Sequence, residues 1–178
     1  MARLARHIRR LLRREDGAST MEFVITFPVI MMLFIAVFET SMIMTRQVML
    51  ERTLDQAVRI MRLADGLTIT APDIREAICD NTDMLPDCMT LLTIDLRPVE
   101  RATYAVPSNQ EMCIERADAS ATLSNQFTSG DDNELMLVRA CFIVDRIVPF
   151  SGFGLNLTRD DSGGLHMMAA SMFVNEPD

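Results

Sequence analysis

The sequence predicts an α+β fold in which one long N-terminal helix precedes a small domain built on an antiparallel β-sheet. Three observations support this prediction. Residues 23–38 are apolar except for Thr26 and Pro28. Beyond them, apolar residues recur on one face of a helix, and short stretches rich in Leu, Val and Ile follow. A chain of 178 residues suits one packed domain plus one apolar helix, so two full domains are not expected.

The charge of the chain divides into a basic head and an acidic body. All 17 basic residues are Arg, and the head holds six of them before residue 15, at positions 3, 6, 9, 10, 13 and 14. Because the net charge is -8, the remainder is strongly acidic. An acidic body repels nucleic acid, whereas the basic head suits a phosphate-rich membrane leaflet. No nucleic-acid partner is therefore expected, and a chain with one Tyr and no Trp also offers little stacking surface for bases.

The apolar segment is long enough to cross a membrane. A helix over 18–45 would be about 42 Å long, which exceeds the thickness of the hydrocarbon layer. Arginines before the segment and acids after it place residues 1 to about 20 in the cytoplasm and the body on the far side. A cleaved secretory signal is the alternative, but no convincing small-x-small cleavage site follows the apolar run. The segment is therefore expected to stay, with a kink or loosening near Val24 caused by Pro28.

Past residue 45 the helix is predicted to become amphipathic and to lie on its own domain. It should stop near Gly66, which can adopt the left-handed conformation of a helix C-terminus. The expected buried face consists of Ile43, Leu50, Leu54, Ala57, Val58 and Met61. The predicted organisation is thus a cytoplasmic head over 1–17, a transmembrane segment over 18–45 and an exported α+β domain over 46–178.

The rest of the exported domain is predicted to contain one short helix and several strands. Residues 67–90 form a connector around a helix that starts near Pro72. The stretch 118–133 is polar and rich in small residues, as exposed loops are. Strands are expected over 91–99, 110–117 and 134–148, and a strand is preferred to a helix over 165–174.

The four cysteines all lie in the exported body and are expected to form two disulfides. The favoured pairing is Cys79 with Cys88 and Cys113 with Cys141, each worth about 3 kcal/mol on the chain-entropy model. Four buried free thiols are the alternative. Zinc is disfavoured because no Cys-x-x-Cys spacing occurs, and the acidic loop 131–134 is expected to be solvated and not to bind calcium. No metal, cofactor or enzymatic activity is expected, since no phosphate-binding glycine loop or nucleophile elbow is present.

The N-terminal sequence "REDGASTMEFVITFP", residues 14–28, resembles that of the TadE-like minor pilins of tight-adherence (Flp, type IV) pilus systems. The resemblance rests on an Arg-rich leader that ends in Gly17, the small residue Ala18, Glu22 five positions after the glycine, and an apolar helix. The tail "MFVNEP" at 172–177 is similar to the Asn-Glu-Pro ending of some members. Many type IV pilins have a basic residue before the glycine, whereas this chain has the acids at 15 and 16, which the TadE-like pattern tolerates.

The resemblance implies a pilin-like fold and a minor pilin or pseudopilin-like role in pilus assembly. A membrane prepilin peptidase would cut between Gly17 and Ala18, leaving a single-pass protein in the bacterial inner membrane or in the pilus. Its N-terminus would be cytoplasmic and its body periplasmic or extracellular. Its other partners would be pilins and the assembly machinery, and Glu22 would pair with the new amine of Ala18 on a neighbouring subunit. Alternatively, Glu22 meets the first-turn amides of its own helix, and the protein is an uncleaved signal-anchored adaptor or adhesin.

Overall fold

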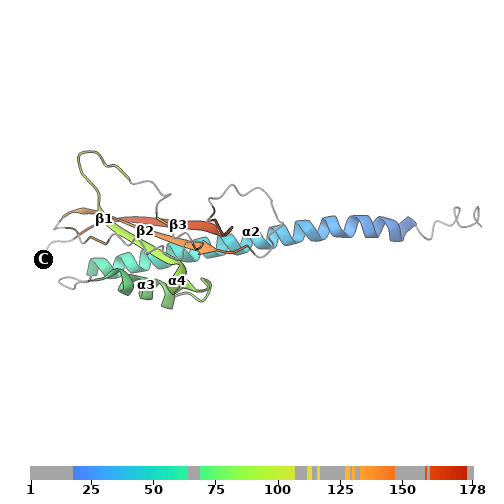
Figure 1. The fold of residues 1–178 in the computed structure, drawn as a ribbon, viewed down its shortest axis with the longest axis horizontal. Coiled ribbons are helices and arrows are strands. Elements are labelled where there is room, and N and C mark those ends of the chain that lie inside the picture. The colour runs from blue at the N-terminus through green and yellow to red at the C-terminus, as the bar shows by residue number, and fades with distance from the viewer. Residues whose placement is uncertain are drawn as a thin grey trace, which may run out of the picture.

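The computed structural model has the predicted α+β fold, with one long helix that projects from a small body (Figure 1). It describes residues 18–63, 69–106, 112–113, 116, 127–128, 130, 133–146, 159 and 161–175. Within these ranges the elements are α2 (Ala18–Leu63), α3 (Ala71–Asp80), α4 (Cys88–Leu91), β1 (Leu92–Pro98), β2 (Leu135–Val144) and β3 (Leu165–Val174).

The helix α2 is a single element of 46 residues, about 69 Å long. Its first half extends beyond the body and its second half lies along the sheet (Figure 1). The helix is continuous through Pro28. The expected stop at Gly66 lies outside the described residues.

The sheet has three antiparallel strands in the order β1-β2-β3. The central strand β2 is buried on both faces, which explains why its sequence is almost continuously apolar. The strand preferred over 165–174 is β3, and its register sets Phe142 opposite Met167 and Ala140 opposite Ala169. Those two pairs belong to the core on the helix-covered face of the sheet.

The helices α2 and α3 cover one and the same face of the sheet (Figure 1). Leu50 and Leu54 of α2 meet Ile74 and Ile78 of α3 in a core with that face. Four buried apolar side chains from two helices complete a layer that three strands alone cannot supply. The second half of α2 is therefore an integral part of the domain.

The helix α3 begins where the sequence predicted, with a proline in its first turn. The Thr70 backbone N–H and hydroxyl both donate to the Asp73 carboxylate, at 2.9 and 2.5 Å. These two hydrogen bonds hold the pKa of Asp73 below its ordinary value, and the bond from the hydroxyl has the larger effect. On its inner side the helix buries Arg75, whose Nε donates to the Leu92 carbonyl at 3.0 Å. Burial lowers the pKa of this guanidinium.

The opposite face of the sheet contains a buried ionic cluster that the sequence analysis did not anticipate. Asp95 of β1 lies opposite Arg139 of β2 and accepts from its Nε at 3.0 Å and its Nη2 at 2.5 Å. The other oxygen of Asp95 accepts from Arg97 at 3.1 and 2.8 Å. Asp95 and Arg139 are almost fully buried. Because the carboxylate receives two guanidinium groups, its burial is compensated.

Two expectations differ from the structure. The strand expected over 110–117 is not found where the structure describes that stretch, since Met112 and Cys113 lie in a bend and Arg116 in a turn. Its remaining residues lie outside the description. The short helix α4 was not expected, and it forms because the chain turns at Asp87, which has a φ of 51°, before entering β1.

Several other expectations fall outside the described residues. They concern the leader with Gly17, most of the loop 118–133 and the end of the tail motif.

Candidate functional site: the exposed half of α2

The first half of α2 is apolar and is not covered by any other described part of the chain. From Ser19 to Phe38 every residue is exposed except Ala36, which is half-buried. The rings of Phe23 and Phe27 stack on one another, with centroids 5.1 Å apart. Such a surface is far larger than the apolar patches that monomeric proteins keep in water. It requires lipid or other apolar helices as its surroundings.

The length and composition of this helix suffice to cross a membrane, and the apolar part is not buried inside the structure. The core helix of a soluble protein would instead be mostly buried. The 20 residues from Ser19 to Phe38 span about 30 Å, which equals the thickness of the hydrocarbon layer. One N-terminal apolar helix of this kind fits a single-pass membrane anchor.

Glu22 is the only charged residue between Ser19 and Phe38. It is the fifth residue of α2, one helical turn after Ala18, and its side chain is exposed. The first turn of α2 contains no acid. Within the described part of the chain, no hydrogen bond or ion pair engages Glu22. Of the three expected residues of the signal, the structure describes Ala18 and Glu22, and Gly17 lies outside the described residues.

Glu39 marks the point where α2 meets the body. It is 6% exposed, and Ile43 one turn later is 8% exposed. The sequence analysis did not predict that Glu39 is buried, although its spacing from the apolar residues of α2 indicates it. Glu39 precedes Ile43 by four residues and Leu50 by eleven, so it continues their face of the helix. The helix therefore changes from an exposed rod to a docked element within two residues of Phe38.

A polar contact supplements the apolar packing of α2 on the body. Gln47 donates from Nε2 to the Met168 carbonyl of β3 at 2.8 Å, and the same amide donates to Glu51 at 2.7 Å. Met168 lies on an edge strand, whose outer backbone groups need partners from outside the sheet. This contact and the core fix the direction in which the exposed half of α2 leaves the body.

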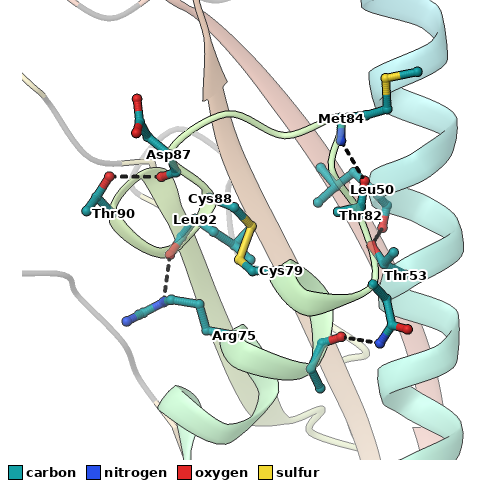
Figure 2. The surroundings of a disulfide bond; sticks show 12 residues. Leu50, Thr53, Arg75, Cys79, Thr82, Met84, Asp87, Cys88, Thr90 and Leu92 are labelled. Atoms are coloured by element: carbon teal, nitrogen blue, oxygen red, sulfur yellow. Dashed lines mark hydrogen bonds between the residues drawn. A yellow bond between two sulfur atoms is a disulfide. The ribbon is translucent and has the colours of Figure 1, made fainter.

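Both disulfides join the pairs that the sequence favoured. Cys79 of α3 is bonded to Cys88 of α4, with Cα atoms 5.6 Å apart, and Leu50 of α2 lies close by (Figure 2). Cys113 is bonded to Cys141 of the central strand, with Cα atoms 5.5 Å apart. All four cysteines are thus paired. The first bond ties α3 to α4, which directly precedes β1, and the second attaches the segment around Cys113 to β2.

Comparison with known proteins finds one family model that is similar to the N-terminal helix. Residues 17–59 match the family model TadE, described as TadE-like protein. The match begins at Gly17 and ends within the docked half of α2, so it covers the whole exposed segment and none of the strands. No curated protein and no solved structure gives a significant match to the chain.

Proposed function

From the TadE-like segment 17–59, which connects the chain to the Tad pilus system, we propose that the protein is a minor pilin or pseudopilin-like subunit. A prepilin peptidase cuts it between Gly17 and Ala18 on the cytoplasmic side of the inner membrane. The remaining chain keeps its apolar helix in the membrane and its disulfide-bonded body outside. From there it joins other pilins through the pilus assembly machinery.

The observation that carries this proposal is the uncovered apolar helix that begins at Ala18, directly after Gly17. A cut at this point removes the basic head and leaves every residue of the apolar helix in place. The product is still an anchored protein, unlike the product of a secretory signal peptidase. Its exposed helix is then available to the helices of neighbouring subunits.

Glu22 has a defined role in this proposal. An ionised carboxylate at the edge of the hydrocarbon layer costs several kcal/mol unless it is paired. The cut creates an ammonium group on Ala18, one turn before Glu22. We expect Glu22 to pair with that amine on a neighbouring subunit, because such a pair sets the register of one helix against the next. Pairing within one chain would neutralise the charge without aligning the subunits.

The deciding experiment measures the intact mass of the full chain after co-expression with its cognate prepilin peptidase. We expect a product that starts at Ala18. A catalytically inactive peptidase and a Gly17→Val chain serve as controls, and both should leave the mass unchanged. If the natural chain keeps its full mass beside an enzyme that cleaves a control prepilin, the protein is instead an uncleaved envelope adaptor or adhesin.

A further inference from the structure

The apolar surface of α2 continues beyond the part that can lie in lipid. Residues 19–38 already account for about 30 Å of hydrocarbon, and Glu39 begins the contact with the body. Met44 and Val48 lie one to three turns further along, yet they are 55% and 59% exposed. In the isolated subunit these two large apolar side chains face water, although other side chains of the same part of α2 are packed against the body.

These side chains belong to one line along the helix. Steps of three and four residues keep side chains on the same side of an α-helix. The line, here called the outer line, consists of Phe34, Val37, Ser41, Met44 and Val48. Apart from Ser41 its members are large and apolar, and all five are exposed.

The outer line faces away from the body. Ile43, Leu50 and Leu54 define the buried side of α2, because they belong to the core under the sheet. At about 100° per residue, Val48 lies roughly 160° and Met44 roughly 120° around the helix from Leu50, so both point away from the buried side. A neighbouring molecule can therefore reach the outer line without displacing the domain.

The spacing of the outer line indicates that a helix covers it. Alternating steps of three and four residues form the seam by which two helices interlock their side chains. Ser41, at the centre of the line, is small enough to let two backbones approach closely. Its hydroxyl donates to the Val37 carbonyl at 2.9 Å. Closing the seam would therefore not leave this hydroxyl without a hydrogen-bond acceptor.

The charges that follow the outer line indicate that the partner is a second copy of the chain. Beyond Val48 the same side of α2 has exposed residues of both signs, namely Glu51, Arg52, Asp55 and Arg59. Two copies anchored in one membrane run parallel and emerge at the same depth. Their apolar residues then meet as far as Val48. Beyond Val48 each residue lies opposite its own copy, and the long side chains of Arg52 and Arg59 of one copy can reach the neighbouring acids of the other. Such a self-complementary surface is what a two-fold symmetric pair requires.

We propose that the outer line is a homodimer interface, in which α2 of one subunit packs in parallel against α2 of a second subunit from Phe34 to Val48. The interface starts in the membrane and continues into the aqueous layer next to it. It rests on the membrane placement of α2 in the proposed function, and it does not require cleavage after Gly17. The dimer can therefore form before processing and reach the assembly machinery as a unit.

Thiol cross-linking in native membranes tests this interface. Because all four natural cysteines are paired, a Val48→Cys or Met44→Cys chain carries a single reactive thiol for a short bismaleimide. Ile60→Cys is the matched control, since Ile60 is 53% exposed on another side of α2. Within the lipid, Val37→Cys is compared with Met32→Cys, which are 66% and 64% exposed on different sides.

We expect a cross-linked product of twice the chain mass at positions 37, 44 and 48, and several-fold less at 32 and 60. Adding Met44→Glu to the Val48→Cys chain should abolish the product, while adding Ile60→Glu should not. Equal cross-linking at all positions, or a product containing a different protein, overturns the proposal. Using cells with and without prepilin peptidase separates the two proposals. A dimer of full-length chains supports the interface even where cleavage fails, and cleavage without a dimer contradicts only the interface.

Discussion

At the scale of single residues, the proposed pairing of Glu22 with the amine of a neighbouring subunit gives the first prediction. Glu22 is exposed on an apolar helix and has no ionic partner among the described residues. We predict that Glu22→Gln leaves membrane insertion unchanged, because the change removes a charge from the hydrocarbon edge. Pilus number should fall strongly, since the proposed pair with the amine of Ala18 is lost. Membrane fractionation and pilus counts measure the two effects.

Glu76→Gln is the matched control for Glu22, because Glu76 is an exposed glutamate on α3 in the body. It should leave both insertion and pilus number unchanged. Normal piliation of the Glu22→Gln strain would remove the proposed role of this carboxylate.

The buried pair of Asp95 and Arg139 gives a second prediction at this scale. Asp95→Ala leaves the Arg139 guanidinium buried without its carboxylate, so we expect the free energy of unfolding to fall by about 3–5 kcal/mol. Asp145→Ala breaks the ion pair with Arg116, where the Asp145 side chain is 71% exposed, and should cost less than about 1 kcal/mol. Denaturant unfolding of the full chain in detergent compares the two. Equal losses would mean that Asp95 contributes no more than a surface acid.

At the scale of elements, the start of α3 is expected to be sensitive to acid. Hydrogen bonds from Thr70 lower the pKa of Asp73, so the folded state favours the ionised form. The resulting stabilisation is fully present above the ordinary pKa of an aspartate. It is lost as the pH falls through the lower pKa of the folded state. Asp73→Asn should therefore lower the melting temperature at neutral pH and lose less stability on acidification than the natural chain.

Asp83→Asn is the control for Asp73, since Asp83 is exposed in the turns after α3. Melting curves from neutral to acidic pH should separate the two variants. If Asp73→Asn follows the pH dependence of the natural chain, the hydrogen bonds at the helix start do not contribute.

The two disulfides should differ in their contribution to stability. Cys79 and Cys88 are 9 residues apart, whereas Cys113 and Cys141 are 28 apart. On the chain-entropy model these loops are worth about 2.5 and about 3.5 kcal/mol. Replacing each pair by serines should therefore destabilise the chain more in the second case, as measured by denaturant unfolding. A larger loss from the 79–88 pair would show that its contacts with the core outweigh loop closure.

Elements that depend on local pattern were predictable from the sequence, and long-range pairing was not. The presence of α2 and its division into an apolar half and an amphipathic half followed from its apolar run and its one-sided periodicity. The strands β1 and β2 followed from their Leu, Val and Ile content. By contrast, nothing in a single sequence shows that Asp95 and Arg139 become neighbours, because their pairing depends on strand register. The turn at Asp87 is local but was also missed, because an aspartate by itself rarely indicates a positive φ.

At the scale of the site, the sequence pattern around Gly17 and Glu22 already resembled that of TadE-like proteins, whose family model matches residues 17–59. The spacing of Glu39 with Ile43 and Leu50 was present as well, but it gained meaning only once the buried face of α2 was known. A carboxylate next to an apolar run suggests a membrane boundary. Its burial depends on a sheet formed by residues far along the chain.

At the scale of the whole molecule, the two halves of α2 serve different purposes. Among the residues that the structure describes, no part of the body covers the apolar first half, whereas the second half supplies Leu50 and Leu54, which are 0% and 1% exposed. Full burial of each such side chain is worth about 2 kcal/mol. Against a total stability of about 5–15 kcal/mol, the loss of the second half would be severe. The body should therefore fold without the first half and not without the second.

We predict that a chain beginning at Glu39 is soluble without detergent, contains both disulfides and unfolds in one cooperative transition. A chain beginning at Ala64 should aggregate or lack a transition, because the sheet then has no helix over much of its apolar face. Non-reducing mass analysis and thermal unfolding compare the two chains. If the chain from Glu39 also fails to fold, the exposed half of α2 contributes to the stability of the body. The division between an assembly segment and a self-sufficient domain would then be wrong.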